Sequence, residues 1–186
     1  MDSRITLRFS LDSSLGRLAR YLRLLGHDAA WARGDSLECA ISRARAEGRV
    51  LLTGSADLSR LGLTMPIAGG MVIASGDRVS QLAKVGGEWP VFSQAEPFSR
   101  CADCNEPLLP LTATEAQARV PAYVAATQES FQACPLCTRV FWKGTHAARL
   151  LDLFAEAAAR CSQNLPASST RRSARPDISD PALPNG

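Results

Sequence analysis

The chain has 186 residues, 46% of them apolar and 21% charged, a composition typical of an ordinary globular protein. Its net charge of +3 is too small to indicate nucleic-acid or membrane binding by itself, so such functions must show in local patterns. No stretch reaches the roughly 18 to 20 apolar residues of a membrane span, and residues 1–11 lack the apolar run of a signal peptide. We therefore expect a cytoplasmic protein without membrane contact.

The first predicted elements are a strand and a helix. Residues 5–11 alternate apolar and polar side chains, which predicts a strand. Residues 15–25 carry leucines at helical spacing, with Ser14 as the N-cap and Gly26 as the residue that ends the helix. The side opposite the leucines carries a basic stripe, which fits either phosphate binding or a solvated helix face. Its members are Arg17, Arg20 and Arg23.

Strands and helices alternate from there to residue 95. Further strands are predicted at 28–31, 50–53 and 71–74, and helices at 36–47, 56–61 and 78–85. This alternation is typical of a parallel sheet flanked by helices. We expect a first α/β domain over residues 1–95, with four or five strands.

The amino-acid composition of the sequence changes after residue 95. Residues 96–160 combine prolines, short β-like segments and two CxxC pairs with an Ala/Leu-rich helix from about 146 to 160, and they predict a second, smaller domain. Residues 161–186 are rich in Ser, Pro, Arg and Ala, which predicts a disordered tail.

The two CxxC pairs predict a zinc site. A CxxC turn directs two thiolates at one ion, and a second turn completes a tetrahedron of soft ligands that suits zinc. The 29 residues between the pairs are expected to form a hairpin. Disulfides or redox motifs are the alternative, which a reducing compartment disfavours. A site with four cysteines has no open position, so the zinc would be structural. The predicted ligands are Cys101, Cys104, Cys134 and Cys137.

The remaining cysteines and an aromatic segment have simpler interpretations. We interpret Cys39 as a small core residue and Cys161 as an unpaired thiol. Trp142 and Lys143 combine a stacking surface with a cation, which suits single-stranded nucleic acid, while packing in the small core of the ribbon is the alternative. His146 is superfluous as a zinc ligand and is expected to pack at a helix start or to contact nucleic acid.

Acidic residues follow the predicted parallel strands. In such a sheet functional residues gather at the carboxyl ends of the strands, where several carboxylates would bind Mg²⁺ or Mn²⁺ and activate water for phosphodiester attack. Alternatively, each acid only caps or begins the following helix. The candidates are Asp12, Asp35 with Glu38 nearby, Asp57 and Asp77.

Five blocks occur together in the chain: SLDSSLGRLARYLRLLGHDAAW, EGRVLLT, RCADCN, VPAYV and FQACPLCTRVFWKGTH. Over residues 5–150 these resemble the PIN-like ribonuclease family with a C-terminal zinc ribbon, named for the C-terminal domain of the animal mutator-seven exonuclease and common as a free-standing bacterial protein. The resemblance implies a PIN-like α/β domain, an acidic metal site that cleaves RNA, and a zinc ribbon packed behind it. It also implies that Asp12 is the first metal-site aspartate and that Asp35 lies in the second acidic region.

The chain departs from this family at one position. After the LLT strand the family usually has Arg and then Asp, whereas this chain has Gly54 and Ser55, and a hydroxyl is a weaker metal ligand than a carboxylate. Asp57 is the candidate replacement, and Asp77 matches the last acidic region only loosely.

Three functions compete on this basis. The first is a ribonuclease dependent on Mg²⁺ or Mn²⁺, with Asp12, Asp35, Asp57 and Asp77 at the metal and RNA held by the basic stripe, Trp142 and Lys143. The second is a non-catalytic RNA-binding or ribosome-associated module, which Ser55 favours. The third, a toxin-like PIN nuclease, is less attractive because such proteins generally lack a ribbon.

Overall fold

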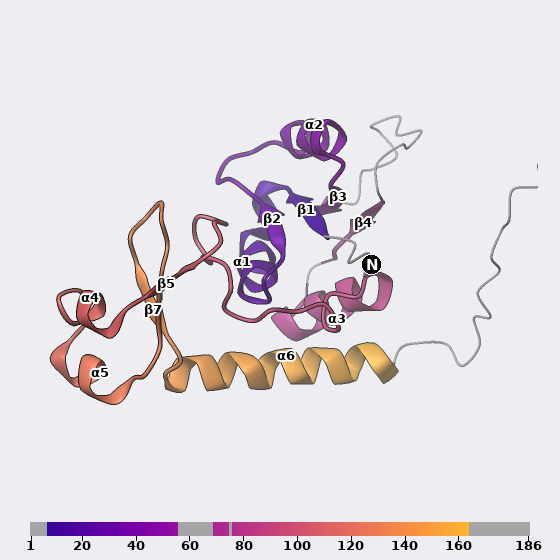
Figure 1. Ribbon diagram of the computed structural model, residues 1–186. Coiled ribbons are helices and arrows are strands. Elements are labelled where there is room, and N and C mark those ends of the chain that lie inside the picture. Colours follow the sequence, from indigo (N-terminus) through magenta and orange to yellow (C-terminus); the bar gives the residue numbers. More distant parts are fainter. Residues whose placement is uncertain (1–6, 56–68, 75, 164–186) are drawn as a thin grey trace, which may run out of the picture.

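Four short parallel strands form the sheet that the alternating pattern predicts (Figure 1). This computed structural model of the protein describes residues 7–55, 69–74 and 76–163. The strand order is β2-β1-β3-β4, and every neighbouring pair is parallel. The α/β class is confirmed, with four strands in the described part of this sheet. Their bounds are β1 (Arg8–Leu11), β2 (Asp28–Ala30), β3 (Val50–Thr53) and β4 (Gly70–Val72).

Helices cover both faces of this sheet. Because successive strand residues point to opposite faces, Phe9 and Leu11 are buried on one face, whereas the Ser10 hydroxyl donates on the other face to the Ala40 carbonyl oxygen at 2.8 Å. Leu51 is buried on that second face, under the helix that carries Ala40. Figure 1 shows α1 and α3 on one side of the sheet and α2 on the other. Their bounds are α1 (Gly16–Leu24), α2 (Leu37–Glu47) and α3 (Arg78–Glu88).

The starts of α2 and α3 agree with the sequence to within one residue, but the start of the first helix does not, and α3 ends at Glu88, three residues beyond its predicted end. A 3-10 turn, Ser13–Leu15, precedes α1, and Asp12 caps this turn by accepting from the Ser14 amide. The prediction of Ser14 as the N-cap is therefore wrong, because helical turning begins at Ser13, two residues earlier than a helix capped by Ser14 would begin. Gly26 follows α1 with a φ of 99°, as its place after the last leucine predicts. The helix predicted at 56–61 lies outside the described residues.

A second, antiparallel sheet carries the cysteine pairs. Its strands, in the order β5-β6-β7, are β5 (Leu109–Leu111), β6 (Phe131–Ala133) and β7 (Val140–Trp142). The hairpin expected between the pairs is present as the antiparallel strands β5 and β6, but its connection is longer than a turn, because two short helices, α4 (Ala113–Gln117) and α5 (Ala122–Thr127), join the strands. Thr112 and Glu115 form a capping box that starts the first of them. These helices bury Ala116 and Val124 against Phe131.

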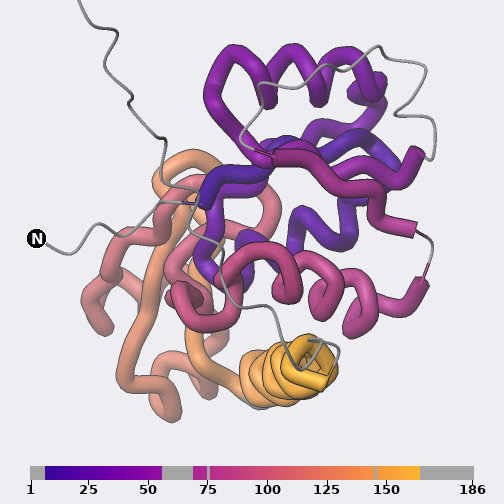
Figure 2. Tube along the Cα trace, turned by 90° about the vertical axis from the view of Figure 1, so that its right-hand side faces the viewer, coloured from indigo at the N-terminus to yellow at the C-terminus, as the bar shows by residue number. Residues whose placement is uncertain are grey.

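The last described helix, α6 (Thr145–Gln163), packs beside α3 (Figure 2). Phe154 and Ala157 of α6 are buried in the core that α1 and α3 share, and the Phe154 ring meets Tyr21 edge-on at 6.4 Å. The sequence groups this helix with the second domain, whereas the structure packs it against α3, one of the helices that cover the four-stranded sheet. The helix also includes residues 161–163, and the rest of the predicted tail lies outside the described residues. No described helix is both long and apolar enough to cross a bilayer.

The segment that joins the two sheets is hydrogen-bonded to the end of α1. The amides of Glu96 and Phe98 donate to the carbonyl oxygens of Leu25 and Leu24 at 2.9 and 2.8 Å. These carbonyls close a helix and have no partner within it. The connection between the sheets is therefore part of the folded structure.

A polar network around Asp28 fastens the first CxxC turn to the parallel sheet. Asp28 accepts from Arg49 at 2.7 Å and from the Asn105 side chain at 2.6 Å, while Asn105 also accepts from the Ala29 amide at 2.9 Å. Burial alone would raise the pKa of Asp28, but the hydrogen bonds and charge of Arg49, with the Asn105 hydrogen bond, lower this pKa to about 2.

We expect this network to make stability depend on acid pH. Because the folded pKa lies below the ordinary value of 3.8, the Asp28 contribution is complete above about pH 4 and is lost as the pH falls toward 2. This contribution to the free energy of unfolding amounts to about 2 kcal/mol. Asp28→Asn should remove this part of the pH dependence in urea unfolding at pH 3 to 7, and the matched change at exposed Asp152 of α6 should not. Equal pH profiles for the wild type and Asp28→Asn would contradict the assignment.

Candidate functional site

Asp12 lies at the carboxyl end of β1, where the strand order reverses. The chain passes from β1 to β2 on one side and returns to β3 on the other, so the ends of β1 and β3 flank the topological switch point. Ligands of open α/β sheets bind at such points. Thr53 and Gly54, at the end of β3, meet Asp12 here: the Thr53 hydroxyl and the Gly54 amide donate to the same carboxylate oxygen, the amide at 2.9 Å.

Four hydrogen bonds fix the Asp12 carboxylate, which belongs to a residue only 5% exposed. Its other oxygen accepts from the Ser14 amide and hydroxyl at 2.8 and 2.5 Å. Burial alone would raise the pKa of Asp12, but the hydrogen bonds from Ser14, Thr53 and Gly54 outweigh burial and lower the pKa below its ordinary value. The group is therefore an oriented anion at neutral pH.

The other acids predicted for this site have partners of their own or are not described. Asp35 forms an ion pair with Arg43 of α2. Asp77 caps α3 and lies 3.7 Å from Arg160 of α6, so the capping alternative holds for it. Asp57 lies outside the described residues. Within the described ranges, the structure does not assemble these carboxylates into a group of three that could hold an ion.

The four cysteines of the CxxC pairs do come together. Their Sγ atoms lie within 4.8 Å of one another, and Cys101 Sγ is 3.8 Å from Cys137 Sγ. Four ligands at the usual Zn–S length of about 2.3 Å stand about 3.8 Å apart in a tetrahedron, so the spacing fits zinc. The amides of Cys104 and Cys137 donate to the first sulfur of each pair at 3.4 and 3.5 Å. Burial and the neighbouring thiols raise the pKa of Cys104 to about 12, so bound metal would be needed to keep all four groups deprotonated.

One protein family matches most of the chain. The family model of the Mut7-C RNAse domain aligns with residues 7–154, which include both sheets and much of α6. The chain belongs to the Mut7-C RNase domain family. The predicted family is thus confirmed, and its name indicates a function of the ribonuclease type. No curated protein and no solved structure matches the chain.

The basic stripe of the Mut7-C chain is only partly exposed. Arg17 is exposed, and Arg20 is exposed while it pairs with Asp103 at 2.9 Å. Arg23 is 4% exposed, and its guanidinium donates at 2.8 Å to the carbonyl oxygens of both Ala29 and Asp103. The prediction that Arg23 contacts RNA phosphates is therefore wrong, because this side chain joins α1 to the first CxxC turn.

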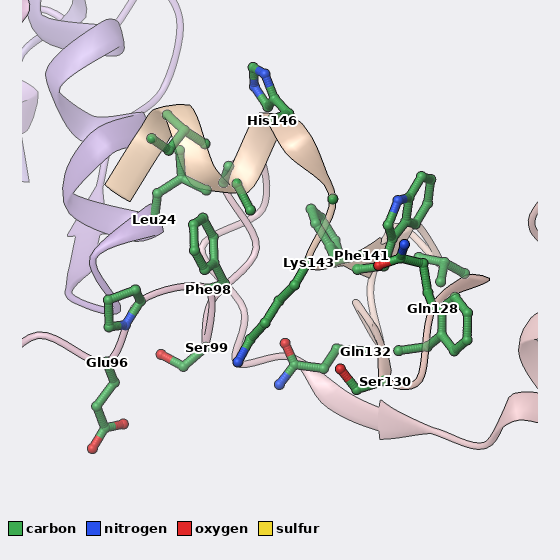
Figure 3. Close-up of a pocket in the computed structure, with 18 of the residues that line it drawn as sticks. Leu24, Glu96, Phe98, Ser99, Gln128, Ser130, Gln132, Phe141, Lys143 and His146 are labelled. Carbon is green, nitrogen blue, oxygen red and sulfur yellow. The ribbon is translucent and has the colours of Figure 1, made fainter. Parts of the chain in front are cut away.

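A cleft of about 1040 Å³ lies between α1, the segment after residue 95, the antiparallel sheet and the start of α6 (Figure 3). The predicted residues Arg17, Arg20, Trp142 and Lys143 all line it, although they are far apart in sequence. Two further lining residues were missed by sequence reasoning. Tyr123 stands in the VPAYV block without a charged neighbour to mark it, and Arg78 is the first residue of a helix whose cap, Asp77, was the only residue singled out there.

Proposed function

We propose that this Mut7-C chain is a PIN-like ribonuclease that hydrolyses RNA phosphodiester bonds at the carboxyl edge of its parallel sheet, with Mg²⁺ or Mn²⁺ as cofactor. The observation that carries the proposal is the position of Asp12, an oriented and ionised carboxylate at the topological switch point of a domain of the ribonuclease type.

The groups around Asp12 suit a hard divalent cation. Two of its four hydrogen-bond donors are the hydroxyls of Ser14 and Thr53, which can rotate their hydrogens away and offer oxygen to a cation. Mg²⁺ needs only one or two protein carboxylates when phosphate oxygens and water complete its shell. When bound, the ion would supply an activated water and stabilise charge on the phosphate. Asp35, Asp57 and Asp77 are the candidates for the second carboxylate.

The test is metal-dependent cleavage of single-stranded and structured RNA by the wild type and by Asp12→Asn. The variant should cleave at least about 100-fold more slowly, since a metal-bound carboxylate supports several kcal/mol of transition-state stabilisation. Asp152→Asn, an exposed acid of α6, is the matched control and should cleave like the wild type. Thermal unfolding of each variant separates lost chemistry from lost fold. Unchanged cleavage by a folded Asp12→Asn variant would remove Asp12 from the site.

The ion pair of Asp35 and the capping role of Asp77 favour a second candidate, a non-catalytic RNA-binding module. In that case the wild type should bind RNA in a salt-dependent manner without metal-dependent cleavage. Ser55→Asp distinguishes the two candidates, because it places a carboxylate where the family usually has one. A gain of cleavage in this variant would identify a decayed site, and measurable cleavage by the wild type would exclude the binding-only function.

A further inference from the structure

We propose that the cleft between α1 and the antiparallel sheet binds single-stranded RNA, with phosphates on Arg17 and Lys143 and bases stacked on Tyr123 and Trp142. The choice of RNA as the ligand rests on the proposed function. The position of the bound strand rests on the side chains that line the cleft.

The charge of the cleft favours a polyanion. Four cationic side chains line it, Arg17, Arg20, Arg78 and Lys143, against the single carboxylate of Glu96. The whole chain has a net charge of only +3, so these cations are concentrated on one surface. Neither Arg17 nor Lys143 forms an ion pair with another described residue. The Lys143 side chain extends into the cleft toward the side that Ser99 and Gln132 line (Figure 3).

The aromatic side chains favour unpaired bases. Tyr123, on α5, is 74% exposed, and Trp142, at the end of β7, is 39% exposed. Aromatic rings in a positively charged groove form stacking platforms for successive bases, and every base offers a π-face. A duplex keeps its base faces stacked within itself, so it cannot use these rings. A protein partner with a neutral surface fits the cleft less well than RNA, because it would leave these cations without anions to pair with.

The cleft also leads toward Asp12. Arg17 lies in the first turn of α1, which only the 3-10 turn Ser13–Leu15 separates from Asp12 at the carboxyl end of β1. Arg78 is the first residue of α3, which follows β4 at the same edge of the sheet, and its guanidinium lies 3.2 Å from the Tyr21 hydroxyl in the cleft. A single-stranded RNA whose bases stack on Tyr123 and Trp142 would therefore reach the candidate active site by passing Arg17 and Arg78.

The test is fluorescence anisotropy with the full zinc-loaded chain and a labelled single-stranded uridine oligomer of about 12 nucleotides, without added Mg²⁺ or Mn²⁺. Tyr123→Ala and Trp142→Ala should each weaken binding about tenfold. Replacing both Arg17 and Lys143 by Ala should lower the slope of log K against log salt by about 1.4, about 0.7 for each phosphate contact. A duplex of the same length should bind more weakly than the single strand.

Two exposed residues outside the cleft lining serve as controls, with melting temperatures measured for every variant. Arg45→Ala on α2, across the sheet from the cleft, and Leu151→Ala on α6 should bind like the wild type. Wild-type affinity in folded Tyr123→Ala and Trp142→Ala variants would overturn the proposal, and so would equal affinity for duplex and single strand.

Cleavage assays separate this proposal from the active-site proposal. Asp12→Asn should bind the oligomer at least as tightly as the wild type, because it removes a negative charge near the RNA, while it loses cleavage. If the cleft variants bind normally and Asp12→Asn loses cleavage, the cleft proposal alone fails. If the cleft variants bind weakly and Asp12→Asn cleaves normally, the active-site proposal alone fails.

Discussion

Removal of zinc should unfold the antiparallel sheet. The core around the sulfur atoms contains little apolar material beyond Leu108 and Phe141, and the neighbouring core under α4 and α5 is equally small. Such cores cannot offset the conformational entropy of ordering the chain, whereas zinc contributes about 10 to 16 kcal/mol of apparent binding free energy to structural sites of this kind. We expect the purified protein to carry about one zinc per chain.

The measurement is zinc content together with far-UV circular dichroism and intrinsic tryptophan fluorescence, to which Trp142 contributes, before and after chelation. Cys134→Ser should purify with less zinc and resemble the chelated wild type. Cys39→Ser is the matched control and should keep both zinc and fold. The interpretation of Cys39 as a core residue is wrong, because Cys39 is exposed on α2, and it is not one of the four clustered cysteines. An antiparallel sheet that survives complete loss of zinc would contradict a structural role for the metal.

Arg23→Met should lower the free energy of unfolding by about 3 kcal/mol. Methionine fills much of the same space but donates no hydrogen bonds. The buried carbonyl oxygens of Ala29 and Ala102 and the part-buried one of Asp103 therefore lose this donor. Each buried acceptor left without a partner costs about 1 to 3 kcal/mol, and hydrogen bonds from a charged donor are at the upper end of this range.

Arg20→Met is the matched control on the same helix. Arg20 is exposed and its partner is the Asp103 carboxylate, a surface ion pair whose loss costs about 0 to 1 kcal/mol. Urea unfolding of both zinc-loaded variants gives the comparison. Equal destabilisation by the two substitutions would show that the buried hydrogen bonds of the Arg23 guanidinium add nothing to the free energy of unfolding.

The zinc ligands were predictable because their chemistry is local. A CxxC turn brings two thiols together without help from the rest of the fold, so long-range packing has only to bring the two pairs to each other. The parallel sheet was predictable for a similar reason, since its strands and helices show their periods in short windows of sequence. The capping box of Thr112 and Glu115 was also visible in the sequence and would have indicated α4.

The burial of the Arg23 side chain was not predictable from helical spacing alone. Residues three apart differ by about 300° around a helix, so Arg23 is turned by about 120° from Arg17. Whether that direction meets solvent depends on where β2 and the first CxxC turn pack, which only the folded chain decides. The same holds for Asp35 and Asp77. Their positions after strands do not reveal that Asp35 forms an ion pair with Arg43 or that Asp77 caps α3.

The hydrogen bonds from Glu96 and Phe98 to the end of α1 have a consequence for the kinetics of RNA capture. They hold the two walls of the cleft in one orientation before any ligand arrives, so the entropic cost of arranging those walls is met during folding. Association should then follow a single exponential without a slow closing phase, and the Glu96 and Phe98 amides should exchange slowly with deuterium in the free protein as well as in the bound one.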